Sequence, residues 1–408
     1  MTSAKAAPQR GTDPESATAF ERLNILLAGL EPGQAPIVLT IGEPRHALPD
    51  FVGPTLAANL DDFRRYPAIR GTDAFRQTVA DWLDKRFKLD GLIDPKVHIL
   101  ALNGSREGLF SAAFIAADLT GKENPVTLLP NPYYHPYSVG ADRAGTEAIF
   151  IDAPEKNGFL PDLDALDPKV LDRTVAFYFA SPANPQGSIA PLDYWQRLIE
   201  LARKHDFYLF ADECYSEIYR DAPPTGVLEA AKAMDGDLSH IVAFNSLSKR
   251  SNLAGLRCGF AVGDPAFISA WTTFRNSAAP QVPMPVQAVG IAAFSDEAHV
   301  EENRRLYNEK FDMAERVLSN SFGFSRPEGG FFVWLDASRF GGGVEMAKRL
   351  WVEQGVKVVP GAYLSHTQAD GSNPGDDYIR LAMVEDIDTT RRALERIAAL
   401  GDERGAGE

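Results

Sequence analysis

One lysine, Lys249, lies in a stretch of small and hydroxylated residues directly after the apolar run HIVAF. A lysine at the end of a buried strand gives up much of its hydration, which suits either a surface cation with a buried stem or an amine tuned to attack carbonyl groups. Ser246 and Ser248 flank this stretch on one side, and Arg257 follows the lysine by eight residues. These side chains could bind a phosphate group, because hydroxyls and a guanidinium donate several hydrogen bonds to its oxygens.

Polar residues also follow other predicted strands at the points where those strands end. The turn 103–107 (NGSRE) opens a helix, where free backbone N–H groups and the positive end of the dipole form either an anion site or an ordinary cap. Asn184 lies in SPANPQG, which alone predicts only a turn. Asp212 ends the run FYLFAD, and a carboxylate there needs a cationic partner or a capping role. Open α/β sheets bind ligands at the carboxyl ends of their strands, so we expect one shared site.

Taken in chain order, these residues predict a binding pocket for pyridoxal phosphate. Asp212 would keep the pyridine nitrogen protonated, which makes the ring an electron sink. Lys249 would form a Schiff base with the cofactor and would then exchange a proton at the α-carbon of the substrate. Tyr215, three residues after the aspartate, belongs to the same set, and Tyr134 in NPYYHPY would supply the aromatic face against the ring.

The motifs SLSKRSNLAGLRCG, NGSREGLF and DECYSEIY resemble those of the class I and II aminotransferases, which have the fold type I of pyridoxal-phosphate enzymes. The resemblance covers nearly the whole chain and implies that Lys249 is the cofactor lysine, with Asp212 and Tyr215 as further catalytic residues. The cofactor-binding residues that it implies are Gly104, Ser105, Arg106, Tyr134, Asn184, Asp212, Tyr215, Ser246, Ser248, Lys249, Arg257 and Tyr66 of the partner subunit.

Further segments bear on the partner subunit and on the substrate. YPAIRGTDAFR resembles the family segment whose tyrosine, here Tyr66, reaches the phosphate in the neighbouring subunit, which implies a homodimer with shared active sites. YIRLAMV resembles the segment whose arginine, here Arg380, binds the substrate α-carboxylate in a bidentate pair. Gly42 in IGEP and Asn184 would also contact the substrate. A second substrate carboxylate would need another cation, and position alone suggests Arg45 or Arg106.

Within the family, these motifs and IGEPRH most resemble the branch that transfers an amino group between glutamate and N-succinyl-diaminopimelate, on the bacterial route to lysine and the cell wall. The expected reaction is a ping-pong transfer, in which glutamate leaves as 2-oxoglutarate before the N-succinyl keto acid receives the amino group. An aminotransferase for aspartate, aromatic or branched amino acids and a carbon–sulfur lyase on the same fold stay open, because both would share Lys249 and Asp212. A non-catalytic effector-binding module is a third alternative.

The composition of the 408-residue chain is ordinary for a globular protein, with 45% hydrophobic and 24% charged residues. A net charge of −15 disfavours nucleic acids and anionic membranes as partners. We find neither the apolar core of a secretory signal nor a stretch long enough to span a membrane. The two cysteines, Cys214 and Cys258, predict a reducing cytoplasm. No histidine has metal-ligand spacing, so we expect no metal site, although His46 and His135 fall near the predicted pocket.

Strands and helices that could position these residues alternate along the chain. One helix is predicted in PLDYWQRLIELARKH, with Pro191 suited to its first turn and an apolar face made of Leu192, Trp195, Leu198, Ile199 and Ala202. Near-continuous apolar runs predict strands that are covered on both faces of a mostly parallel sheet. These runs are 96–102, 125–130, 147–152, 174–180, 207–213, 240–246 and 258–263.

The predicted fold class is α/β, with a large domain around a mostly parallel sheet and a smaller α+β domain, as in the fold type I transferases. The pattern changes at a proline-rich break in 275–287, and residues 286–318 then read as helical. The predicted divisions are a disordered N-terminus (1–16), an N-terminal segment packed on the small domain (17–48), a large cofactor-binding domain (49–285), a small C-terminal domain (286–400) and a flexible tail (401–408).

Overall fold

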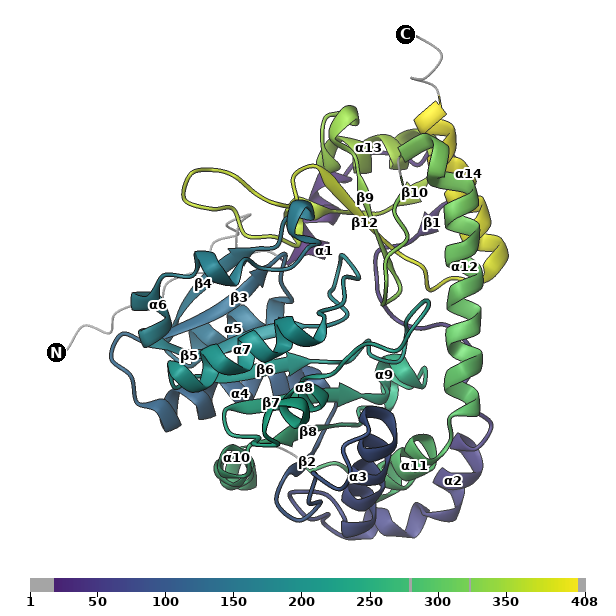
Figure 1. The fold of residues 1–408 in the computed structure, drawn as a ribbon. Coiled ribbons are helices and arrows are strands. Elements are labelled where there is room, and N and C mark those ends of the chain that lie inside the picture. The colour runs from purple at the N-terminus through teal and green to yellow at the C-terminus, as the bar shows by residue number, and fades with distance from the viewer. Residues whose placement is uncertain (1–17, 279–280, 323, 403–408) are drawn as a thin grey trace, which may run out of the picture.

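A seven-stranded sheet forms the centre of the larger part of the molecule (Figure 1). The computed structural model describes residues 18–278, 281–322 and 324–402. β8 runs antiparallel to its neighbours β2 and β7, and the other neighbouring strands pair in parallel, which confirms the predicted architecture. In order across the sheet, the strands are β2 (Ile99–Leu102), β8 (Gly259–Gly263), β7 (Ile241–Ser246), β6 (Tyr208–Asp212), β5 (Thr174–Ala180), β3 (Val126–Asn131) and β4 (Glu147–Asp152).

Helices cover both faces of this sheet, which is why its strands read as continuous apolar runs. Every residue of β2, β6 and β7 is buried. The first core cluster joins one face to α3 (Asp73–Phe87), α7 (Leu192–Lys204), α8 (Val227–Met234) and α11 (Met284–Ser295). A second cluster joins the other face to α4 (Ser105–Thr120), α5 (His135–Arg143) and α10 (Pro265–Ala278), while α6 (Pro168–Arg173) precedes β5.

The predicted helix in 191–205 is confirmed as α7, with a small change in its buried face. Four of the five predicted apolar residues are buried, but Leu192 is 39% exposed. Tyr194 is buried instead, and its hydroxyl donates a hydrogen bond to Pro161 O at 2.8 Å. Pro191 takes the cap position just before the first turn. The helical period thus predicted the element, and the buried face includes Tyr194 in place of Leu192.

The C-terminal part of the chain builds a separate core around a three-stranded antiparallel sheet. The N-terminal segment joins this part, because β1 (Ile37–Val38) pairs in parallel with β10 (Val356–Lys357). α1 (Ala19–Leu26) also packs here, through Leu23 against Val359. The other elements are β11 (Val359–Pro360), β12 (Tyr378–Ala382), β9 (Phe332–Asp336), α12 (Ala298–Phe322), α13 (Gly343–Gln354) and α14 (Ile387–Asp402).

The stretch 286–318, predicted as helical, contains two helices, because α11 ends at Ser295 and α12 begins at Ala298. α11 packs on α2 (Val52–Ala58) and α3, and its Val289 and Phe294 belong to the large core. α12 runs along one side of the molecule, from α2 and α11 towards α13 and α14 (Figure 1). These contacts group α11 with the larger part, so we propose to move the domain border from residue 285 to the junction of α11 and α12.

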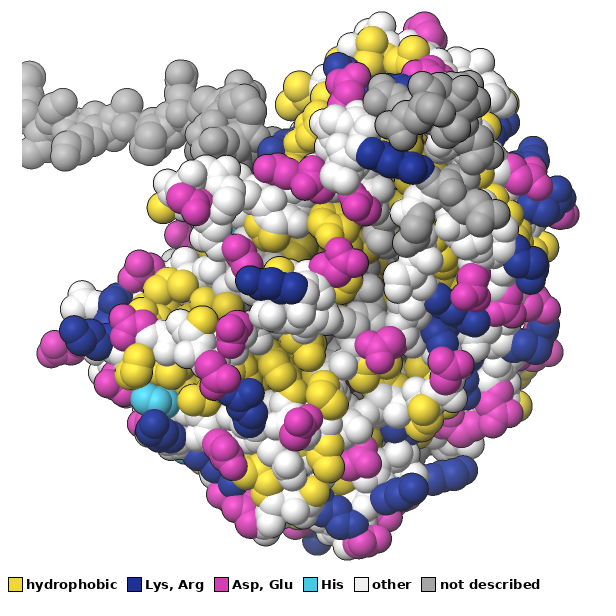
Figure 2. Space-filling model, turned by 45° about the horizontal axis from the view of Figure 1, so that its top comes forward, with side chains coloured by type: hydrophobic (Ala, Val, Ile, Leu, Met, Phe, Trp, Pro, Cys, Tyr) yellow, Lys and Arg dark blue, Asp and Glu magenta, His cyan; other side chains and the backbone are white. Residues whose placement is uncertain are grey.

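The surface carries charges of both signs, which are interspersed with hydrophobic side chains over the face shown in Figure 2. Within the described residues, no helix is both long and apolar enough to cross a membrane, and no three or more potential metal ligands come together. The predicted N-terminal segment 1–16 lies outside the described residues. Of the predicted tail, residues 401–402 still belong to α14, and residues 403–408 lie outside the described part.

Candidate active site

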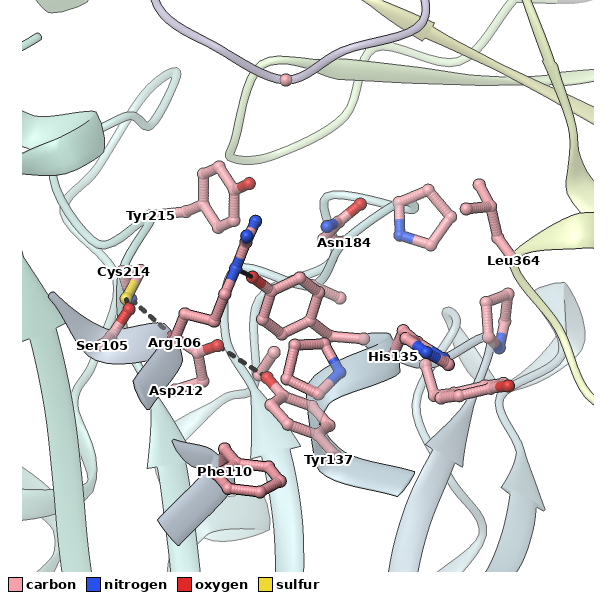
Figure 3. Close-up of a pocket in the computed structure, with 18 of the residues that line it drawn as sticks. Ser105, Arg106, Phe110, His135, Tyr137, Asn184, Asp212, Cys214, Tyr215 and Leu364 are labelled. Atoms are coloured by element: carbon pink, nitrogen blue, oxygen red, sulfur yellow. Dashed lines mark hydrogen bonds between the residues drawn. The ribbon is translucent and has the colours of Figure 1, made fainter. Parts of the chain in front are cut away.

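The carboxyl ends of the parallel strands open into a cavity of about 1590 Å³ that both parts of the chain line. Asp212 ends β6, Ser246 ends β7, and Asn184 lies in the turn after β5. Figure 3 shows Ser105, Arg106, Asn184, Asp212 and Tyr215 around one space. The predicted site residues that line the cavity are Gly42, Ser105, Arg106, Tyr134, Asn184, Asp212, Tyr215, Ser246, Ser248, Lys249, Arg257 and Arg380.

Lys249 lies on the short helix α9 (Leu247–Arg250), directly after β7, and its amine points to the N-terminal segment. Its Nζ donates a hydrogen bond to Gly42 O and lies 5.1 Å from the centre of the Phe331 ring. Burial is the main cause that lowers the pKa of Lys249 from 10.5 to about 8, and the positive charges of Arg106 and Arg380 act in the same direction. An amine with a lowered pKa is neutral more often at pH 7, which is the form that attacks carbonyls.

Asp212 is buried at the base of the cavity, and two donors hold its carboxylate. The hydroxyl of Tyr137 donates to Oδ2 at 2.6 Å, and the main-chain N–H of Cys214 donates to Oδ1 at 3.2 Å (Figure 3). Burial, followed by the charge of Asp212, raises the pKa of Tyr137 well above its usual range, so this hydroxyl keeps its proton. Tyr137 is not among the residues predicted from the sequence, although its place on α5, three residues after Tyr134, could have marked it.

The N-terminus of α4 and the loop after β7 form a cradle of hydrogen-bond donors. Among the described residues, no side chain caps the first turn of α4, so its N–H groups stay available to an anion. Gly104 has φ of 79°, and a Cβ at this position would overlap Nη2 of Arg257, so glycine is needed for the guanidinium to approach the helix end. The hydroxyls of Ser246 and Ser248 lie 3.0 Å apart on the same side. This arrangement fits a phosphate group.

Arg380 is a buried cation with donor capacity to spare. Its Nη2 donates to Thr40 O at 2.7 Å, its Nη1 to Asn184 Oδ1 at 3.3 Å, and its guanidinium lies 4.4 Å from the centre of the Phe332 ring. Its Nε is buried and finds no hydrogen-bond partner among the described residues. Burial lowers its pKa from 12.5 to about 10. A buried guanidinium that is paired only with neutral groups favours an anionic ligand.

Aromatic side chains form part of the cavity wall. Arg106 donates from Nε to the hydroxyl of Tyr134 at 2.8 Å, and Tyr134 meets Tyr137 edge to face with ring centres 5.4 Å apart. Tyr215 packs edge to face on Phe331 at 5.2 Å. Burial raises the pKa of Tyr134 and of Tyr215, so both hydroxyls remain protonated donors at neutral pH. The wall therefore combines flat apolar faces with two phenolic donors.

Three predicted site residues, Gly104, Arg45 and Tyr66, are not part of the cavity wall. Gly104 borders it, because it lies against Arg257, which does line the cavity. Arg45 forms an ion pair with Glu385 and is not part of the wall, which corrects the suggestion that it reads a second substrate carboxylate. Arg106 lines the cavity, so its predicted role in binding a second substrate carboxylate stays a prediction. Tyr66 is 97% exposed and also lies outside the wall of the cavity of its own chain.

The comparisons with known proteins agree over most of the chain. A family model described as aminotransferase class I and II matches residues 35–397. The LL-diaminopimelate aminotransferases of Maridesulfovibrio salexigens and Moorella thermoacetica are each 32% identical to this chain, and the matches cover 89% and 88% of the chain and 91% and 90% of the relatives. A solved aminotransferase from Neisseria meningitidis has a TM-score of 0.89 and 36% identity, and the match covers 94% of this chain and 98% of that one.

Members of this family use pyridoxal phosphate, and the residues present fit that cofactor. The cradle at α4 suits its phosphate, the carboxylate of Asp212 suits a protonated ring nitrogen, and the amine of Lys249 suits its aldehyde. With this fit and the matched length, the chain belongs to the class I and II aminotransferases, which depend on pyridoxal phosphate.

Proposed function

We propose that this chain transfers an amino group between the pair glutamate and 2-oxoglutarate and an amino acid of the diaminopimelate type. The observation that carries the proposal is that a partly buried amine, a strand-end carboxylate and a buried guanidinium face one cavity, from Lys249, Asp212 and Arg380. Amino transfer needs these three groups together, because it combines a proton shift at the α-carbon with binding of the neighbouring carboxylate.

Each residue has one proposed task. Bound pyridoxal phosphate supplies an electron sink for negative charge at the α-carbon of the substrate. Lys249 holds or releases the proton at that carbon, which its lowered pKa favours near neutral pH. Asp212 keeps a proton on the ring nitrogen, and Tyr137 holds its carboxylate in place. Arg380 binds the α-carboxylate and thereby fixes the direction of the Cα–H bond.

The second carboxylate of the substrate calls for another cation in the cavity. Arg106 is the candidate, because its side chain lines the cavity while Arg45 is paired with Glu385 elsewhere. The motifs alone predicted the N-succinyl form of diaminopimelate. The relatives at 32% identity carry the name LL-diaminopimelate aminotransferase, which favours the unsubstituted amino acid. We therefore propose LL-diaminopimelate as the substrate and keep its N-succinyl form as the alternative.

The absorbance of the purified protein with pyridoxal phosphate tests this proposal. We expect glutamate and LL-diaminopimelate, added separately, to change the visible absorption of the bound cofactor, and 2-oxoglutarate to restore it. A response to glutamate and N-succinyl-LL-diaminopimelate, without one to LL-diaminopimelate, would favour the alternative. A response only to aspartate or phenylalanine would discard the diaminopimelate assignment. If added cofactor gives no visible absorption, the whole proposal fails.

We also propose a homodimer in which each copy completes the site of the other. Large hydrophobic side chains are exposed together around the segment before Tyr66, since Leu60 is 57% and Phe63 is 56% exposed. Exposed apolar residues so close in sequence are typical of an interface.

We also propose a cytoplasmic location, with which the free and buried thiols of Cys214 and Cys258 agree.

Removal of the Tyr66 hydroxyl tests the shared site. If Tyr66 binds the phosphate of the partner subunit, Tyr66→Phe should raise the dissociation constant for pyridoxal phosphate about tenfold, because a hydrogen bond to a charged group contributes about 1.5–3 kcal/mol. Equilibrium dialysis gives this constant, and sedimentation shows whether the protein is a dimer. Tyr219→Phe is the matched control, because Tyr219 lies outside the cavity wall. A monomeric protein, or equal constants for both variants, would contradict the shared site.

A further inference from the structure

A buried chain of hydrogen bonds leads from α12 to the main chain of Lys249. Asn303 is 2% exposed and donates from Nδ2 to Lys249 O at 3.1 Å and to Arg250 O at 3.3 Å. Its Oδ1 lies 2.7 Å from Nδ1 of His46. Nε2 of His46 lies 2.8 Å from Nζ of Lys310, which is also 2% exposed. Asn303, His46 and Lys310 lie outside the cavity wall, so they act on the site only through the residues that they hold.

The groups at the two ends fix the direction of every hydrogen bond in this chain. Main-chain carbonyls only accept, so the NH₂ of Asn303 faces them and its oxygen faces His46. His46 must then carry its proton on Nδ1, which leaves Nε2 to accept from the ammonium of Lys310. Burial and the charge of Lys310 lower the pKa of His46, in agreement with a neutral ring. Each donor thus has an acceptor, in one direction from Lys310 to Lys249.

These hydrogen bonds connect both the amine and the main chain of Lys249 to one short segment. Its Nζ donates to Gly42 O, and its main-chain carbonyl reaches His46 through Asn303. Gly42 and His46 are only four residues apart in the sequence. The segment 42–46 therefore holds both the amine and the backbone of Lys249, and so it sets the position of one relative to the other.

Lys310 extends the same series of hydrogen bonds towards the strand that carries Arg380. Its Nζ also donates to Met383 O at 3.2 Å, and Met383 closely follows β12, the strand that carries Arg380. Arg380 in turn donates to Thr40 O, two residues before Gly42. Buried hydrogen bonds thus connect the elements that carry the proposed proton-transfer amine and the proposed carboxylate-binding group.

A neighbouring contact of α12 has the side chains of a hydrolase triad but no access for a substrate. Nε2 of His299 lies 2.8 Å from Oγ of Ser251, and its Nδ1 lies 2.5 Å from Oδ2 of Asp296. Ser251 is 0% exposed and does not line the cavity, so its hydroxyl cannot meet a substrate. This contact fastens the loop after Lys249 to α12, and Asn303 makes the contact with Lys249 itself.

We propose that Asn303, oriented by His46 and Lys310, is a positioning residue that sets where the amine of Lys249 lies relative to Gly42 and Arg380. The inference rests on the proposed function, in which Lys249 moves the proton at the α-carbon. Proton transfer depends steeply on distance, and a displacement of about 1 Å costs about 10²-fold in rate. Loss of these hydrogen bonds should therefore change the environment and the reactivity of the amine, while the remaining cavity wall stays in place.

Two leucine variants and one conservative variant test this role. Leucine replaces Asn303 or His46 with similar volume but without hydrogen bonds, whereas His46→Gln keeps one donor and one acceptor and so preserves the direction of the chain. Glu301→Ala, on the exposed face of α12, is the control. The readouts are the pH midpoint of the visible absorption of bound pyridoxal phosphate, its dissociation constant, kcat and KM for glutamate, and the thermal midpoint.

We expect both leucine variants to shift the pH midpoint of absorption by about half a unit or more, because the surroundings of the amine change. Their kcat should fall about 10- to 100-fold, with a smaller change in KM for glutamate. His46→Gln and Glu301→Ala should stay within about threefold of the unaltered protein.

Equal pH midpoints for His46→Gln and His46→Leu would overturn the inference, and so would an Asn303→Leu protein with the original midpoint. A loss of thermal stability and kcat without a shift in the midpoint would show a merely structural role and would also overturn it. If Asn303→Leu does not fold, the two variants at His46 decide. The unaltered protein separates this test from that of the proposed function. If it shows no visible absorption, both proposals fail, whereas unchanged midpoints in the variants of a protein that does absorb would overturn only this inference.

Discussion

Replacement of Lys249 by alanine is expected to remove the visible absorption of bound pyridoxal phosphate and to lower the rate of amino transfer at least about 10⁴-fold. Of the described residues that line the cavity, Lys249 alone carries a primary amine. Burial lowers its pKa to about 8, so a larger fraction is neutral at pH 7 than for an exposed lysine. The change removes both the attachment point of the cofactor and the group that moves the proton.

One further variant tests whether the positive charge of Lys249 is sufficient without its amine. A second variant shows whether loss of a lysine elsewhere affects the rate. Lys249→Arg keeps a positive charge but lacks an amine that can lose its proton, so we expect it to be as inactive as Lys249→Ala. Lys348→Ala removes a partly exposed lysine of α13 and should leave the rate unchanged. Formation of 2-oxoglutarate from glutamate measures the rate, and a spectrum is recorded for each protein. A Lys249→Ala protein that retains the visible absorption would contradict the role of this lysine.

The residues of the site that follow a strand could be placed from the sequence. Asp212 and Ser246 each close an apolar run, and the parallel sheet brings such ends to one edge, where the structure has them. Lys249 follows the second run on a four-residue helix, so its place near that edge needed no knowledge of other elements. The apolar runs and the expectation of a mostly parallel sheet together sufficed for this part of the cavity.

Contacts between distant segments could not be derived in this way. Arg45 pairs with Glu385, which is 340 residues away, and no local pattern marks that partner. The bond between His46 and Asn303 spans 257 residues, and its members become recognisable only when α12 lies against the loop after Lys249. The sequence predicts that α11 belongs to the smaller domain, because a helical pattern does not say which surface covers the helix. Its packing against α2 and α3 favours the larger part instead.

Replacement of Asp212 by asparagine is expected to lower the rate of amino transfer about 10²- to 10³-fold, with the cofactor still bound. Loss of one partner of a buried charged pair costs about 2–5 kcal/mol, and each 1.4 kcal/mol is about tenfold. Asparagine has the same shape but no charge, so it cannot hold a proton on the ring nitrogen. The phosphate cradle of Ser246, Ser248 and Arg257 is unchanged, so the visible absorption should persist.

Tyr137 makes the test of Asp212 specific. Its hydroxyl donates to Oδ2 of Asp212 at 2.6 Å, so Tyr137→Phe removes a hydrogen bond from the carboxylate but leaves the charge. A hydrogen bond to a charged group contributes about 1.5–3 kcal/mol, so the rate of Tyr137→Phe should fall less than that of Asp212→Asn. If Asp212 acts through its charge, Tyr137→Phe and Asp212→Asn should be close to non-additive, because the bond has no charged partner once the carboxylate is gone. Additive losses, or an Asp212→Asn protein with the original rate, would show that this carboxylate does not govern the ring nitrogen.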